Sequence, residues 1–124
     1  MSNTTNKNGY VFSITHFDND PDRVAVPLVL ANNALAMGQE VLIWVTLEGV
    51  QLARQGASKG LQPKSFPAIE ELLQSFKEGG GKIGVCPPCA KTHGVTDEDL
   101  VENASWMGAA AVLEQSQTRH SAWF

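Results

Sequence analysis

The stretch Glu40-Val41-Leu42-Ile43-Trp44-Val45-Thr46 decides the fold of this chain. It is a nearly unbroken apolar run of strand length, rich in β-branched and aromatic residues. Such a run is typical of a parallel strand that helices cover on both faces. A helix is predicted before it, at about 22–37, and a short helix after it, at 47–54. Strands that alternate with helices in this way predict βαβ units and a parallel sheet.

The same alternation extends toward both ends of the chain. Residues 9–15 form a predicted strand, and Pro27 predicts either a late start or a kink in the helix that follows. The segment 55–64 contains two glycines and a proline and is predicted to be a mobile loop. A helix that begins at Pro67 follows it and ends at three successive glycines. The remaining predicted elements are strands at 82–85, 104–107 and 121–124, short helices that begin near Pro88 and Thr96, and a helix at 109–117.

Length and composition limit what the chain can be. Its 124 residues favour one domain over 9–124, preceded by a polar, disordered lead-in at 1–8. The sequence contains no apolar run near the roughly 20 residues of a membrane span and no apolar signal core, so a cytoplasmic location is expected. The net charge of −4 argues against nucleic acid as a partner, because such surfaces usually carry a basic stripe.

Both cysteines lie in Val85-Cys86-Pro87-Pro88-Cys89-Ala90-Lys91-Thr92-His93-Gly94, directly after the predicted strand 82–85. The carboxyl edge of a parallel sheet is where open α/β proteins place their chemistry. A close cysteine pair in a reducing compartment is more often catalytic, redox-active or metal-binding than a structural disulfide. Free N–H groups and the dipole of the following helix are expected to favour the Cys86 thiolate, although two prolines remove donors there.

The neighbours of Cys86 leave several roles open. Lys91 and His93 supply nearby cations or proton donors. Cys89 either resolves a disulfide or persulfide on Cys86 or packs against the small helix. His93 completes Cys-x2-Cys-x3-His, a partial zinc signature without an evident fourth ligand; alternatively, it caps the helix before Gly94. No metal site and no cofactor are predicted.

A second group of polar residues follows the first predicted strand and includes His16 and Asp18. In a parallel sheet this loop lies at the same edge as Cys86, so both side chains are candidates to shape a binding pocket. The alternative is that they are solvated turn residues and that Asp20 or Asp22 caps the next helix.

The order and spacing of several short segments resemble the DsrE/DsrF-like family of small sulfur-relay proteins. The resemblance covers about residues 9–124. The segments that carry it are Arg23-Val24-Ala25-Val26-Pro27, Met37-Gly38-Gln39-Glu40-Val41, Thr46-Leu47-Glu48-Gly49-Val50, Cys86 at a strand end with Gly94-Val95 eight residues on, an acidic helix start, and a final Trp-Phe.

This resemblance implies a three-layer α/β/α sandwich with a mostly parallel sheet of about five strands, assembled as a homotrimer or hexamer. It implies that Cys86 accepts sulfane sulfur as a persulfide from a donor protein and passes it to an acceptor protein, as a sulfurtransferase or persulfide carrier does. A thioredoxin-like fold is disfavoured, because that fold places its Cys-x-x-Cys motif after an early strand and at the start of a long helix.

Cys89 departs from the family pattern and keeps two alternatives open. One is a thiol–disulfide redox protein that uses Cys86 and Cys89. The other is a metal- or small-ligand-binding module that uses both cysteines and His93. The predicted catalytic residues are Cys86 and Cys89, and the predicted binding residues are His16, Asp18, Lys91 and His93.

Overall fold

The computed structural model describes residues 8–124, so the predicted lead-in at 1–8 lies outside the described residues except for Asn8. The strands are β1 (Tyr10–Ile14), β2 (Val41–Val45), β3 (Lys82–Val85), β4 (Ala104–Trp106) and β5 (His120–Trp123). The helices are α1 (Pro21–Ala36), α2 (Ile69–Glu78), α3 (Pro87–Thr92) and α4 (Ala109–Ser116), with two short 3-10 helices, η1 (Leu47–Ala53) and η2 (Asp97–Asp99).

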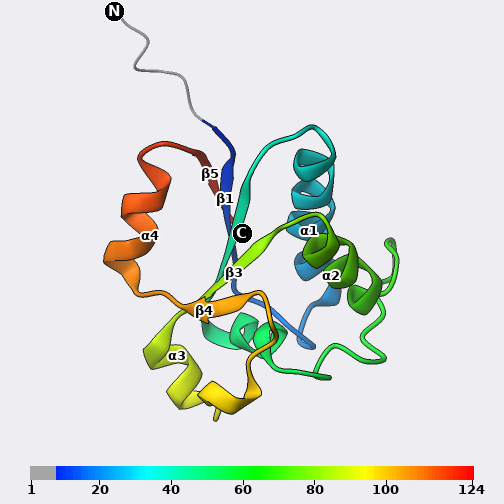
Figure 1. The fold of residues 1–124 in the computed structure, drawn as a ribbon. Coiled ribbons are helices and arrows are strands. Elements are labelled where there is room, and N and C mark those ends of the chain that lie inside the picture. The colour runs from blue at the N-terminus through cyan, green and yellow to red at the C-terminus, as the bar shows by residue number, and fades with distance from the viewer. Residues whose placement is uncertain (1–7) are drawn as a thin grey trace, which may run out of the picture.

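The five strands form one parallel sheet in the order β4-β3-β2-β1-β5 (Figure 1). The apolar strand β2 lies at its centre, where Ile43 pairs with Phe12 on one side and Ile83 on the other. Helices α1 and α2 lie on one side of the sheet and α4 on the other (Figure 1). The predicted three-layer α/β/α architecture with a parallel sheet is therefore confirmed.

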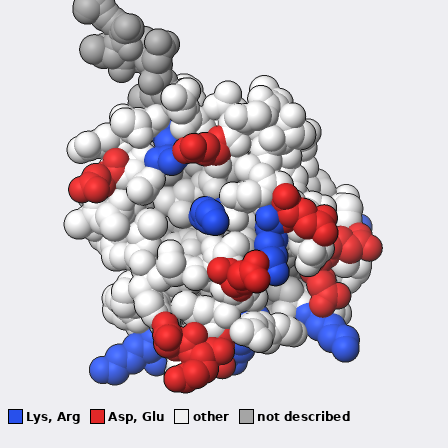
Figure 2. All heavy atoms as spheres, viewed as in Figure 1, with Lys and Arg blue, Asp and Glu red and all other residues white. Residues whose placement is uncertain are grey.

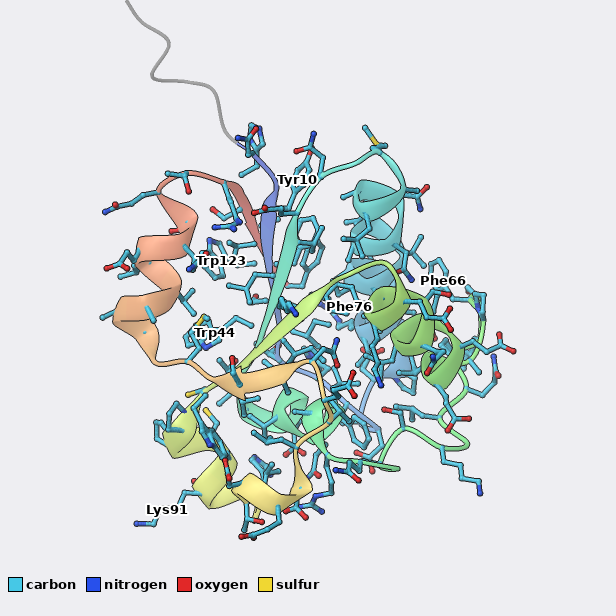
Figure 3. All side chains as sticks on the ribbon, viewed as in Figure 1. Tyr10, Trp44, Phe66, Phe76, Lys91 and Trp123 are labelled. Atoms are coloured by element: carbon cyan, nitrogen blue, oxygen red, sulfur yellow. The ribbon has the colours of Figure 1, made fainter. Side chains whose placement is uncertain are left out.

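Alternate residues of β2 enter two separate cores. Ile43 belongs to the larger core, which lies under α1 and α2 and contains Phe76. Leu42 and Trp44 belong to a smaller core with Val112 of α4. Figure 3 shows Trp44 on the α4 side of the sheet and Phe76 on α2. This two-sided burial explains why the run of β2 is apolar at nearly every position.

Helix α1 begins earlier than the sequence predicts. It starts at Pro21, and Asp20 caps it by accepting a hydrogen bond from the backbone N–H of Arg23 at 3.3 Å. The late start predicted from Pro27 is wrong, because Pro27 lies inside α1 and is buried. Pro21 suits this first helical position, because proline already has the φ of a helix and its missing N–H would have no partner inside the helix there.

Two other helix starts differ from the prediction by one or two residues. Helix α2 begins at Ile69 and not at Pro67, because Ala68 is not helical, with φ −54° and ψ 140°, and the N–H of Ile69 donates to the carbonyl of Leu61 at 3.0 Å. Helix α3 begins at Pro87, one residue before the predicted start. None of the helices that the model describes is long and apolar enough to cross a membrane.

Candidate functional site

Cys86 lies at the junction of β3 and α3, at the carboxyl edge of the sheet. Its backbone N–H donates to the carbonyl of Val45 at 3.1 Å, which continues the pairing of β3 with β2 by one residue. Its own carbonyl accepts from the N–H of Ala90 at 3.0 Å, which closes the first turn of α3. The residue itself is extended, with φ −67° and ψ 115°, and is the N-cap of α3. The backbone of Cys86 is therefore fixed from both sides.

The side chain of Cys86 is more deeply buried than a reactive cysteine usually is, with 9% of the residue exposed. Burial raises the pKa of the Cys86 thiol above its ordinary value of 9.0, and this effect outweighs the nearby backbone N–H of Cys89, which lowers the pKa. The Cys89 side chain raises the pKa further. The expected shift toward thiolate is therefore wrong. Helix α3 is short and begins with two prolines, and Cys86 makes no side-chain capping hydrogen bond to it.

Cys89 lies one turn along α3, and both cysteines are free thiols. Cys89 is partly exposed, and the two prolines between the cysteines are exposed. The two thiols interact, because the Cys89 side chain affects the titration of Cys86. The edge of the cysteine pair that faces solvent is thus formed by Pro87, Pro88 and Cys89.

The other two candidate residues of this segment, Lys91 and His93, lie at the end of α3 that is farther from Cys86. Lys91 is exposed and extends from α3 away from the body of the protein (Figure 3). His93 is the C-cap residue of α3, as the capping alternative predicted. Its Nδ1 lies 3.9 Å from Oε2 of Glu48 in η1. Within residues 8–124, no three or more His, Cys, Asp or Glu side chains are grouped to hold a metal ion, so the structure does not assemble Cys86, Cys89 and His93 as a metal site.

The loop after β1 lies at the same edge of the sheet but is separated from Cys86. Nδ1 of His16 lies 3.0 Å from Oγ1 of Thr15, and that hydroxyl donates to the carbonyl oxygen of Phe124 at 3.2 Å. Asp18 is exposed. Strand β2 and helix η1 lie between this loop and β3. Gly49 of η1 packs so closely on Ile14 that a Cβ would be 2.2 Å from its carbonyl oxygen.

Arg54 positions α3, and the sequence analysis did not identify it. Its Nη2 donates to the carbonyls of His93 at 3.2 Å and Gly94 at 2.9 Å, which are the last carbonyls of the turn that ends α3. The only signal in the sequence is an isolated arginine at the end of the short helix after β2. A contact across about forty residues is invisible to local pattern analysis.

Comparisons with known proteins agree with this architecture. The model of the DsrE/DsrF-like family matches residues 9–122. The uncharacterized protein MJ0989 of Methanocaldococcus jannaschii is 36% identical over 91 residues, which are 73% of this chain and 76% of that protein. The uncharacterized protein MK0008 of Methanopyrus kandleri is 36% identical over 81 residues, which are 65% of this chain and 64% of that protein, less than two thirds of its length.

Solved structures show the same fold at low identity. The crystal structure of the ychN protein from E. coli matches with a TM-score of 0.77 and 12% identity, over 94% of this chain and 99% of that chain. The protein of unknown function MTH1491 from Methanobacterium thermoautotrophicum matches with a TM-score of 0.66 and 18% identity, over 94% of this chain and 99% of that chain. At these identities the similarity concerns the fold alone.

Proposed function

This chain belongs to the DsrE/DsrF-like family, and on that premise we propose that it is a sulfur-relay protein that carries sulfane sulfur as a persulfide on Cys86. One observation supports this most directly: Cys86 is a free thiol fixed between β3 and α3 at the carboxyl edge of the sheet. That edge is where parallel α/β sheets present reactive groups. Exposed Pro87 and Pro88 leave the cysteine turn accessible to a partner.

The proposed reaction exchanges one sulfur atom between two thiols. The Cys86 sulfur, as thiolate, attacks the terminal sulfur of a donor persulfide, the donor S–S bond breaks, and a new S–S bond forms on Cys86. The electron pair of the broken bond leaves with the donor sulfur, which takes up the proton that Cys86 released. An acceptor thiolate then attacks the terminal sulfur of the Cys86 persulfide, and Cys86 regains a proton. No oxidant is required, because each step passes the sulfane sulfur at an unchanged oxidation level.

The surroundings of Cys86 suggest how the persulfide would be held. The backbone N–H of Cys89 lies near the Cys86 sulfur and favours its anion. Lys91 and His93 lie on the same short helix and are proposed to contact the donor or acceptor protein. His16 and Asp18 lie at the same edge of the sheet as Cys86 but are separated from it by β2. They are therefore proposed to contact the donor or acceptor protein and not the Cys86 sulfur.

We also propose that the donor and acceptor are proteins, that the chain works in the cytoplasm, and that it assembles as a homotrimer or hexamer. Support for assembly comes from Val26 and Leu30, two exposed apolar side chains that lie four positions apart and therefore on one face of α1. Light scattering coupled to size-exclusion chromatography measures the oligomer directly, and a monomer at micromolar concentration would contradict this part of the proposal.

The deciding experiment is the intact mass of the protein after incubation with a sulfane-sulfur donor such as thiosulfate with a sulfurtransferase. The proposal expects a gain of one sulfur atom that a reductant removes. Cys86→Ser is expected to abolish the gain and Cys89→Ser to retain it. A Cys86→Ser variant that still gains labile sulfur would contradict the proposal.

A thiol–disulfide protein is the second candidate, and one observation favours it. Both thiols are free, Cys89 lies one helical turn beyond Cys86, and the Cys89 side chain affects the titration of Cys86. The same mass measurement separates the two candidates. A loss of two hydrogen atoms that requires both cysteines, without a sulfur gain, would favour the redox protein.

A further inference from the structure

Cys89 is the only cysteine of the chain besides Cys86, and the first turn of α3 sets its position relative to Cys86. Cys86 is the N-cap residue of α3 and Cys89 is the third residue of the helix. Residues three positions apart on a helix lie on the same face, with about 5–6 Å between their Cβ atoms. The proposed sulfur relay requires Cys86 alone, so the structure leaves a second thiol beside the reactive one without a role.

A second helix start in the chain has the same spacing, and there the two side chains are in contact. Thr96 is the N-cap of η2 and Asp99 is its third residue, and Oγ1 of Thr96 lies 3.0 Å from Oδ2 of Asp99. At the start of α3, the backbone N–H and the side chain of Cys89 both interact with Cys86. The N–H of Ala90 donates to the Cys86 carbonyl at 3.0 Å and closes this turn. The two sulfurs therefore lie close together on a fixed turn, as in the Cys-x-x-Cys motifs of disulfide oxidoreductases.

We propose that Cys89 releases the outer sulfur of the Cys86 persulfide as sulfide when no acceptor protein takes it, an inference that rests on the proposed persulfide. The Cys89 thiolate, which has lost its proton to solvent, attacks Sγ of Cys86. A bond forms between the two cysteine sulfurs, and the bond from Cys86 to the outer sulfur breaks. The electron pair of the broken bond leaves with the outer sulfur, which keeps its own proton and departs as hydrosulfide. The outer sulfur is reduced and the Cys89 sulfur is oxidised, so this step requires no further oxidant or reductant. A dithiol then reduces the Cys86–Cys89 disulfide, is itself oxidised to a disulfide, and restores both thiols.

The burial of Cys86 favours attack on its own sulfur over attack on the outer sulfur. Attack on the outer sulfur would move that atom to Cys89 and expel the Cys86 thiolate, whereas attack on Sγ of Cys86 expels hydrosulfide. A leaving sulfur departs faster when the pKa of its conjugate acid is lower. Burial raises the pKa of the Cys86 thiol above its ordinary value of 9.0, and hydrogen sulfide is a stronger acid than such a thiol. In the free chain, sulfide release is therefore the favoured reaction of Cys89 with the persulfide.

The surface around α3 gives small thiols in solution no advantage over Cys89. Figure 2 shows acidic and basic side chains together at the lower end of the visible face, where Figure 1 places α3 and η2. The acidic residues of η2 are Asp97, Glu98 and Asp99, and the basic residue of α3 is Lys91. A surface of mixed sign does not concentrate small anionic thiols by electrostatic steering. A thiol held on the same helical turn has, in contrast, a high effective concentration at the Cys86 sulfur.

The test is a time course of the persulfide after loading has stopped. The reduced protein is loaded briefly with thiosulfate and an immobilised sulfurtransferase, separated from both, and followed without added thiol by intact mass and by a sulfide assay. In the parent, we expect a transient gain of one sulfur atom, then a mass two hydrogen atoms below that of the reduced protein and release of about one sulfide per chain. In Cys89→Ser, the persulfide is expected to persist at least about tenfold longer. Thr92→Ser, which changes an exposed residue of the same helix, is expected to behave as the parent does.

The results that would overturn sulfide release differ from those that would overturn the sulfur relay. A persulfide that lasts equally long in the parent and in Cys89→Ser would overturn sulfide release and leave the relay standing. Sulfur that peptide mapping locates on Cys89, with Cys86 as a free thiol, would also overturn it, because the outer sulfur would then be the one attacked. A Cys86–Cys89 disulfide that forms without release of sulfide would show that an oxidant and not the persulfide produced it. A failure of every protein, including Cys89→Ser, to gain sulfur would contradict the relay itself, and sulfide release with it.

Discussion

The raised pKa of Cys86 makes a direct prediction about the pH dependence of its reactivity. In a Cys89→Ala variant, Cys86 is the only remaining cysteine, and burial, the largest cause of its raised pKa, is still present. Only the thiolate reacts with an alkylating reagent. With a pKa above 9.0, less than about 1% of the thiol is ionised at pH 7. The alkylation rate is therefore expected to rise about tenfold for each pH unit between 6 and 8 and to keep rising at pH 9.

The assay is the loss of free thiol with iodoacetamide, followed by mass spectrometry at each pH. The same variant unfolded in urea is the control, because its thiol titrates near the ordinary value and reacts faster than the folded thiol at every pH below 9. A rate that reaches a plateau below about pH 8 would refute the reasoning, since it would show a depressed pKa and a helix effect larger than burial.

Three further predictions concern the framework around the site. Phe76→Ala removes a fully buried ring from α2 and is expected to lower the free energy of unfolding by about 3–5 kcal/mol in urea denaturation, whereas Phe66→Ala, at a partly exposed ring, costs clearly less. Equal losses for the two would contradict the assigned core. Gly49→Ala places a Cβ 2.2 Å from the Ile14 carbonyl oxygen and is expected to cost about 1–3 kcal/mol, whereas Gly108→Ala meets no atom within 4 Å and should change the unfolding free energy by less than about 0.5 kcal/mol. A Gly49→Ala variant as stable as the parent would show that η1 does not pack on β1 as described. The pKa of Asp99 is lowered by hydrogen bonds from Thr96, so its contribution to stability is present above its ordinary value of 3.8 and is lost as the pH falls through the lower folded value. In thermal melts from pH 6 to pH 2, the melting temperature of Asp99→Asn is expected to fall less steeply with decreasing pH than that of the parent. The same dependence of melting temperature on pH in both proteins would contradict this prediction.

The sequence predicted the architecture well where burial determines which residue types occur in consecutive positions. The strand β2 is covered by helices on both faces, and its apolar run predicted this before the sheet order was known. The capping box at the start of η2 follows from its residues alone, because Thr96 and Asp99 are three positions apart and each binds the backbone or side chain of the other.

The helix starts were less predictable because distant contacts set them. Asp22 caps no helix but accepts the backbone N–H groups of Lys64 and Ser65, about forty residues away, and α2 begins at Ile69, whose N–H donates to the carbonyl of Leu61. Neither proline marks the start of its helix as the sequence predicted. Pro27 is accommodated inside α1 by burial, and Pro67 lies before a helix that it was predicted to begin. Local propensity gives the position of a helix, and tertiary contacts decide its first residue.

In the candidate site, too, local sequence predicts the position of a residue, and tertiary packing decides its properties. The place of Cys86 after a short strand was readable from the sequence, because parallel strands end at one edge. The sign of its pKa shift was not readable, since the shift depends on how much of the thiol the packed chain covers. His93 was predicted either to complete a partial zinc signature or to cap the helix; it is the C-cap of α3, and its contact with Glu48 in η1 could not be predicted from the local pattern.

The burial of Cys86 has a consequence for any sulfur relay through it. A thiol that is almost entirely protonated at neutral pH reacts slowly with solutes that reach it by diffusion, such as small oxidants and free disulfides. A donor protein that docks on the exposed edge of α3 changes this situation, because its own cationic or N–H groups can stabilise the thiolate at the moment of attack. The pKa of Cys86 would then be lower in the complex with the donor than in the free protein. If Cys86 carries sulfur as proposed, its low reactivity in the free protein favours transfer from protein donors. The rate of sulfur transfer to Cys86 from a cognate donor protein should therefore exceed the rate from a small persulfide at the same concentration. Equal loading rates for the two would show that the free chain already presents a reactive thiol, which contradicts the burial of Cys86 as the basis of selectivity.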